Sequence, residues 1–111
     1  MSTIELTRFS VLEEKTAELL AARPGMLADF RADRSGFVAA RLVRLPAGEW
    51  LDIVEWATPE DFAASREKGG NLPGIARFFA AIDQLVSAEE GTLADRPAAS
   101  DRAVGVSRPV R

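Results

Sequence analysis

An aspartate stands between two tryptophans in EWLDIVEWATPEDF, the segment that contains both tryptophans of the chain. Because side chains alternate along a β-strand, four of its residues would share one face: Trp50, Asp52, Val54 and Trp56. Asp52 would then be a carboxylate among apolar neighbours, which must be ion-paired or protonated. We therefore consider Asp52 a candidate general base with a raised pKa.

Each of these residues also has a structural interpretation. Asp52 can form an ion pair with an arginine of a neighbouring strand, such as Arg41 or Arg8, or it can face solvent. Trp56 either lines a pocket or is a core aromatic that seats the following helix. Trp50, next to a turn, either contacts a ligand or lies at a dimer interface. The two rings cannot stack on each other, since they lie about 20 Å apart along the strand.

The composition limits the available chemistry, because the chain has no histidine, cysteine or tyrosine. A Ser-His-Asp triad, thiolate chemistry and metal or haem sites with histidine or cysteine ligands are excluded. Any reaction must use carboxylates, Arg or Lys, amides, hydroxyls, tryptophan or the substrate itself. We expect no metal site.

Charge and hydropathy argue against two classes of partner. The net charge is −3, and no cluster of basic residues is interleaved with aromatics, so we expect no nucleic-acid partner. The start, MSTIELTRF, lacks the features of a signal peptide, and no apolar run approaches the roughly 20 residues of a membrane span. We expect a cytoplasmic protein without membrane contact.

The hydrophobic periods predict alternating strands and helices. Strands are expected at 3–11 (with a bulge near Arg8), 37–45, 49–57 and 86–93, and helices from Leu12, over 59–68 and from Pro73. Thr58 followed by Pro59 and two acids is a helix start signal. Pro24-Gly25 interrupts the first helical pattern and predicts a kink or two short helices. The order is that of an α+β, ferredoxin-like split β-α-β fold with a four-stranded antiparallel sheet and helices on one face.

At 111 residues the chain is expected to be one domain with a modest core, which dimerisation commonly enlarges. Residues 1–93 carry all predicted elements. Residues 94–111 are small, polar and proline-bearing, with four Arg and two Asp. Valines at alternate positions there predict an extended C-terminal arm that can pack on a partner subunit.

The element order and the pattern GF…ARL…GEWLDIVEWATPEDF resemble the antibiotic biosynthesis monooxygenase family of the dimeric α/β-barrel superfamily. The resemblance covers most of residues 3–93, and its most specific piece is WATPEDF, residues 56–62. It implies a homodimer whose sheets pair into a barrel, with a pocket in each protomer between sheet and helices. Characterised members oxidise phenols or anthrones to quinones with O₂ and use no metal or flavin, so the resemblance implies no cofactor.

The resemblance also implies catalytic positions. Trp56 matches a tryptophan of the quinone-forming members, and Asp52 stands where they have an asparagine. Their arginine corresponds to Arg66 or Arg77. The expected substrate-binding residues are Trp50, Val54, Phe62 and Phe78.

These observations predict a cofactor-independent monooxygenase acting on a phenolic or polycyclic aromatic molecule. Asp52 would deprotonate the substrate, an arginine would stabilise the oxyanion, and Trp56 would pack against the ring. Two alternatives are a non-catalytic dimeric ligand-binding or structural protein of the same fold, and a polyketide cyclase or isomerase. A cavity of a few hundred Å³ beside Asp52 would favour an enzyme or a binding protein. Phenylalanines filling that space would favour a structural role.

Overall fold

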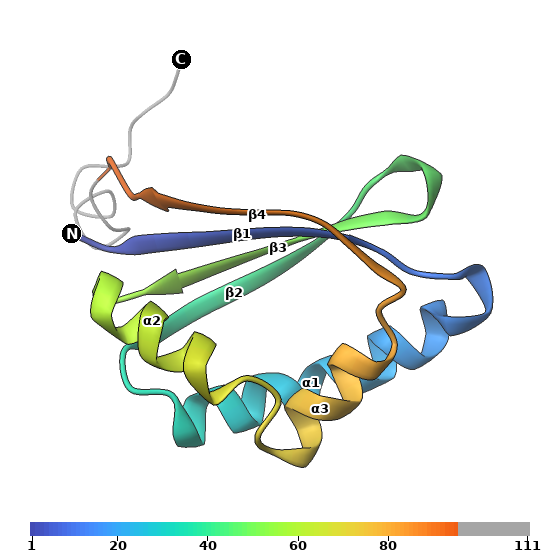
Figure 1. Cartoon of the computed structure of the whole chain (residues 1–111), viewed down its shortest axis with the longest axis horizontal. Helices are drawn as coiled ribbons and strands as arrows, with labels where there is room; N and C mark the ends of the chain where they lie inside the picture. Colours follow the sequence, from blue (N-terminus) through green and yellow to red (C-terminus); the bar gives the residue numbers. More distant parts are fainter. Residues whose placement is uncertain (96–111) are drawn as a thin grey trace, which may run out of the picture.

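The computed structural model describes residues 1–95, so most of the arm predicted for residues 94–111 lies outside the described residues. The elements are β1 (Thr3–Ser10), η1 (Glu13–Lys15), α1 (Thr16–Asp33), β2 (Phe37–Arg44), η2 (Pro46–Gly48), β3 (Glu49–Trp56), α2 (Pro59–Lys68), α3 (Pro73–Ala80) and β4 (Gln84–Thr92). They form a sheet with the three α-helices beneath it (Figure 1). The predicted order of strands and helices is confirmed.

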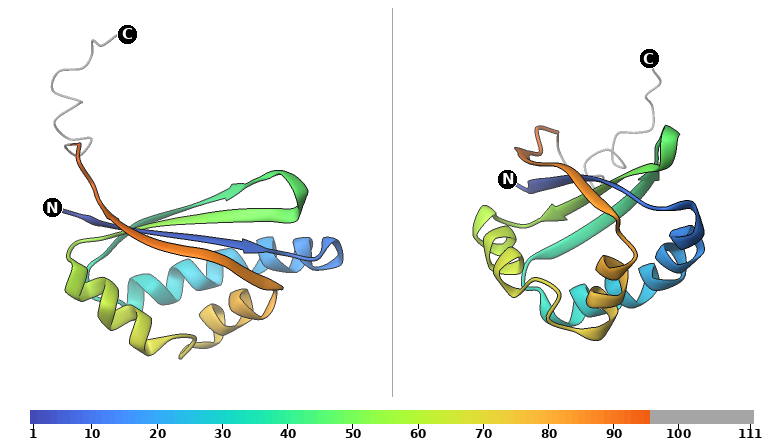
Figure 2. Two further views of the ribbon diagram at one scale, coloured as in Figure 1. Left: turned by 45° about the horizontal axis from the view of Figure 1, so that its top comes forward. Right: turned by 45° about the vertical axis from the view of Figure 1, so that its right-hand side comes forward.

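The strands form one antiparallel sheet in the order β2-β3-β1-β4. All α-helices cover the same face of this sheet, and no helix of the described chain covers the other face (Figure 2). The register of β1 and β4 shifts between Arg8 and Phe9, where a bulge was predicted. This is the ferredoxin-like α+β arrangement expected from the sequence.

Two helices follow their local sequence signals in different ways. The Thr58 hydroxyl accepts a hydrogen bond from the Asp61 N–H at 3.0 Å, which caps α2 as predicted. Helix α1, in contrast, continues through Pro24 as one element, so the alternative of two short helices is wrong. Pro24 cannot bond the carbonyl of Leu20, but both residues are exposed, and water can satisfy that carbonyl.

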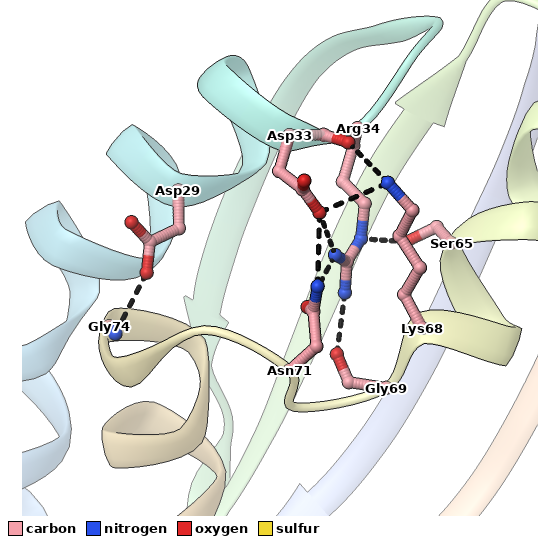
Figure 3. A network of polar contacts seen from close by, with 8 residues as sticks. All are labelled: Asp29, Asp33, Arg34, Ser65, Lys68, Gly69, Asn71 and Gly74. Carbon is pink, nitrogen blue, oxygen red and sulfur yellow. Dashed lines mark hydrogen bonds and ion pairs between the residues drawn. The ribbon is translucent and has the colours of Figure 1, made fainter.

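Helices α1 and α3 approach each other closely at Gly74, in the first turn of α3. A side chain at this position would collide with the Gly25 carbonyl and the Asp29 carboxylate of α1, so only glycine allows this contact. The Asp29 carboxylate of α1 then accepts a hydrogen bond from the Gly74 N–H at 2.8 Å (Figure 3). These contacts place α3 against α1 beneath the sheet.

A polar network fixes the other end of the helical layer (Figure 3). The buried Arg34 guanidinium donates to the Ser65 hydroxyl, to the carboxylate of Asp33, to the Asn71 side chain and to the carbonyl of Gly69. Hydrogen bonds from Asn71 and Lys68 lower the pKa of Asp33. The network joins the end of α1 to the end of α2 and to the loop before α3.

The core lies between the sheet and the helices. Along β3 buried and half-buried residues alternate, so Trp50, Asp52, Val54 and Trp56 share the inner face as predicted. Trp56 is fully buried, and its ring stacks on that of Phe62 with centroids 6.3 Å apart. The rings of Phe30 and Phe37 also contact Trp56, each at 5.8 Å between centroids. Trp56 therefore seats α2 on the sheet.

Candidate active site

A cavity of about 360 Å³ lies between the inner face of the sheet and the helices α1 and α3. Its polar lining consists of Glu5, Thr7 and Asp52. The remaining lining residues are apolar: Phe9, Met26, Phe30, Val54, Phe78, Phe79, Ile82 and Leu85. The size and the lining are typical of sites for small, largely apolar molecules.

Asp52 forms an ion pair at one wall of this cavity. Both of its oxygens accept hydrogen bonds from the Arg23 guanidinium of α1, at 2.7 and 2.8 Å, and both side chains are about nine-tenths buried. The Arg23 guanidinium also lies 5.2 Å from the centre of the Phe78 ring. The bidentate geometry and the burial make this a strong charge-assisted contact.

An ion pair of Asp52 was one of the sequence-based alternatives, but the predicted partners were wrong. Arg41 lies opposite Ile53 in the register, so it belongs to the outer face of the sheet. Arg8 also lies on that face and pairs with Glu49 at 3.1 Å. The actual partner comes from a helix, where Arg23 occupies the buried stripe that includes Leu19, Ala22, Met26 and Phe30.

Glu5, like Arg23, is a site residue that was not predicted from the sequence. It lies on the inner face of β1, opposite Val54 in the register. Its carboxylate accepts hydrogen bonds from the Trp56 indole N–H at 3.0 Å and from the Thr7 hydroxyl at 3.4 Å. Burial raises the pKa of Glu5, the hydrogen bond from Trp56 acts in the opposite direction, and the charge of Asp52 raises the pKa further.

A signal for Glu5 was present in the alternation of β1. Thr3, Glu5, Thr7 and Phe9 share one face, and the antiparallel register sets that face against the inner face of β3. The sequence shows this alternation, but it does not show that β1 and β3 are neighbours in this register. For that reason the acid of β1 could not be placed beside Asp52.

The structure brings together some of the predicted site residues and not others. Asp52, Val54 and Phe78 line the cavity. Trp56 lies beside it in the core, and reaches it through its hydrogen bond to Glu5.

The other predicted residues lie elsewhere. Phe62 and Arg66 border a smaller cavity of about 170 Å³ that shares Glu5, Phe30 and Phe79 with the larger one. The guanidinium of Arg66 lies 4.7 Å from the centre of the Phe62 ring. Trp50 is buried on the inner face of the sheet and borders a separate groove between α1 and β2. The arginines that line this groove are Arg23, Arg31 and Arg44. Arg77 is exposed on α3 and borders none of these spaces.

Two further observations concern residues 1–95. No group of three acidic side chains in this part of the chain is arranged to hold a metal ion. None of its helices is both long and apolar enough to cross a lipid bilayer.

Several solved structures share this fold. SnoaB, a cofactor-independent oxygenase from Streptomyces nogalater, matches with a TM-score of 0.59 and 24% identity, over 86% of this chain and 94% of SnoaB. A candidate antibiotic biosynthesis monooxygenase from Caulobacter crescentus matches with a TM-score of 0.65 and 14% identity, over 85% of this chain and 91% of that protein. Another candidate antibiotic biosynthesis monooxygenase, from Chloroflexus aurantiacus, matches with a TM-score of 0.62 and 16% identity, over 87% of this chain and 97% of that protein.

No protein-family model and no curated protein sequence matches the chain significantly. At the identities of the solved structures, the likeness establishes the fold alone. The chain has the fold of the antibiotic biosynthesis monooxygenases, as the sequence resemblance predicted.

Proposed function

We propose that this protein is a cofactor-independent monooxygenase that oxidises a phenolic or polycyclic aromatic molecule with O₂ in the cytoplasm. The observation that carries the proposal is the cavity of about 360 Å³, whose apolar wall is interrupted by two carboxylates, Glu5 and Asp52. The fold shared with SnoaB, a cofactor-independent oxygenase, supports it.

The reaction needs no external reductant. An anthrone and one O₂ give a quinone and one water, and all four electrons come from the CH₂ group that becomes a carbonyl. The first requirement is removal of a proton, because the electron-rich anion is the species that transfers an electron to O₂. A carboxylate in a largely apolar cavity can take this proton if its pKa is raised toward the working pH.

The cavity residues have distinct proposed roles. Val54 and Phe78 contact the substrate ring, and Phe30 completes the apolar wall. Of the two arginines considered for the oxyanion, we assign that role to Arg66, because it borders the smaller cavity that shares Glu5. Arg77 borders neither space, so we assign it no role in the reaction.

A second candidate function is non-catalytic binding of a small aromatic ligand. The ion pair between Asp52 and Arg23 favours this function, because a non-catalytic protein was expected to hold Asp52 in an ion pair. A cyclase or isomerase would use the same cavity and a carboxylate base without consuming O₂. Measurement of O₂ uptake therefore separates oxidation from both alternatives.

Incubation with an anthrone or a dihydroxynaphthalene, with chelator present and no added flavin, should increase O₂ uptake over buffer. Val54→Phe should lower this rate by about tenfold or more, since the larger ring occupies the space of the substrate. An oxygen electrode measures both rates. Ala64→Phe, at an exposed position of α2 outside the cavity, is the control and should retain the wild-type rate. Equal O₂ uptake with and without protein would refute the oxygenase.

We also propose that the protein is a homodimer formed through the outer face of the sheet. That face is uncovered by helices in the described chain and carries half-buried apolar side chains: Ile4, Leu6, Leu51 and Ile53. Uncovered apolar surface of this kind is typical of protein–protein interfaces. The resemblance to dimeric α/β barrels implies the same pairing.

Light scattering after gel filtration should therefore give about twice the chain mass of 12.0 kDa. Ile53→Glu should shift the protein to the monomer mass, because it places a charge in the interface. Ala64→Glu on α2 should remain dimeric. A wild-type mass equal to one chain would contradict the dimer.

A further inference from the structure

We propose that Glu5, and not Asp52, is the carboxylate that accepts the proton of the substrate, with Trp56 as the residue that positions it. The inference rests on the proposed oxygenase function and adds a catalytic residue that lies outside the segment containing the tryptophans. Three observations carry it: the bonding of Asp52, the bonding of Glu5, and the charges around Glu5.

Asp52 is poorly suited to take a proton. Both of its oxygens are engaged by the Arg23 guanidinium at 2.7 and 2.8 Å in a buried pair. Protonation would leave the Arg23 cation buried without its counter-charge, and losing one partner of such a pair is strongly unfavourable. Asp52 therefore holds Arg23 and shapes the cavity wall.

In the described part of the chain Glu5, unlike Asp52, accepts hydrogen bonds only from neutral groups. Within residues 1–95 no lysine or arginine forms an ion pair with it, and the hydrogen bonds it accepts come from the neutral groups of Trp56 and Thr7. A carboxylate has about four lone-pair positions, so two remain for a substrate hydroxyl. Glu5 also lies where the two cavities meet, because it lines both of them.

The charges that face Glu5 come from several elements. Asp52 faces it from β3, and Glu90 of β4 lies directly opposite in the register. Arg66 of α2 and Arg34 at the end of α1 border the smaller cavity with it. Burial raises the pKa of Glu5, and the negative charge of Asp52 raises it further. The hydrogen bonds from Trp56 and Thr7 and the charge of Arg66 act in the opposite direction, but the net shift of this pKa is upward. A base that must accept a proton near neutral pH benefits from such surroundings.

The proposed steps balance. The C–H or O–H bond of the substrate breaks, its proton moves to a Glu5 oxygen, and the electron pair stays on the substrate. The anion reduces O₂ and bonds to it, and Glu5 returns the proton to give a hydroperoxide. Glu5 then takes the remaining C–H proton, the carbonyl forms as the O–O bond breaks, and hydroxide combines with that proton as water.

Glu5→Gln and Asp52→Asn, compared over a range of pH, test the assignment. Glu5→Gln should lower kcat about 10²–10⁴-fold with little change in KM, and it should abolish the loss of activity at low pH. Asp52→Asn should retain an acid limb, but at lower pH, because the Asp52 charge that raises the pKa of Glu5 is removed. The loss of kcat in Glu5→Gln relative to wild type should become smaller as the substrate hydroxyl becomes more acidic, because such a substrate ionises without a base.

Thermal unfolding shows whether a loss of activity in Glu5→Gln comes from loss of the base or from loss of folded protein. A raised pKa means that stability is lost as the pH rises through it, so Glu5→Gln should unfold at a higher temperature than wild type in neutral buffer. Below the ordinary glutamate pKa of 4.5 the two should coincide. If an active wild type keeps its acid limb in Glu5→Gln and loses it in Asp52→Asn, Glu5 is not the base. A wild type that consumes no O₂ refutes the oxygenase and this inference with it.

Discussion

Replacement of Arg23 by methionine should lower the free energy of unfolding by about 3–5 kcal/mol, the usual cost of removing one partner from a buried ion pair. The variant would leave the Asp52 carboxylate buried, with both of its strong hydrogen bonds lost. Methionine retains most of the apolar contact of the arginine stem, so the effect reports mainly the charge. Chemical denaturation measures it.

The double variant Arg23→Met with Asp52→Leu is the matched control. It removes both charges from the cavity wall, and it should recover most of the stability that the single variant loses. Recovery would show that the pair is retained for a reason other than stability, such as shaping the cavity. A single variant within about 1 kcal/mol of wild type would show that Asp52 is not held as the geometry indicates.

Truncation of Trp56 to alanine should lower the free energy of unfolding by about 3–5 kcal/mol, as expected for a large buried aromatic. Trp56 is fully buried between the sheet and α2, and three phenylalanine rings contact it. Phe79→Ala provides the comparison, because 44% of Phe79 is exposed and its loss should cost less. Equal losses in the two variants would contradict the central place of Trp56 in the core.

Trp56→Phe tests the hydrogen bond from Trp56 to Glu5 separately from the role of Trp56 in the core. It preserves most of the ring contacts but removes the indole N–H that donates to Glu5 at 3.0 Å. That hydrogen bond lowers the pKa of Glu5, so its loss should raise this pKa and move the acid limb of the activity profile to higher pH. An unmoved acid limb in an active variant would show that Trp56 does not position the base.

Much of the fold could be predicted because its signals are local. Alternation along 49–56 indicated a strand with one buried face, and Thr58-Pro59 indicated the start of α2. Pro24 misled in part, since an exposed proline can stay within a helix when water satisfies the freed carbonyl. These features depend on nearest neighbours along the chain, which the sequence displays directly.

The site was harder to predict because it depends on contacts between distant segments. The alternation of its own strand indicated that Asp52 faces inward. Its partner Arg23 lies 29 positions away on α1. The apolar stripe of α1 is weak, so the sequence did not show which face of this helix meets the sheet. Glu5 became a cavity residue only through the pairing of β1 with β3. Arg77 was assigned from the family resemblance by its position in the chain, and in the structure it is exposed and does not line the cavity.

Isotopic labelling tests most directly whether the cavity oxidises an aromatic substrate with O₂ and without a cofactor. The protein should be incubated with an anthrone under ¹⁸O₂, with chelator present, and the quinone analysed by mass spectrometry. We predict enzyme-dependent quinone that carries one labelled oxygen atom. Failure of the protein to increase quinone formation, or a product whose new oxygen is unlabelled, would show that the protein is not a cofactor-independent oxygenase of this substrate.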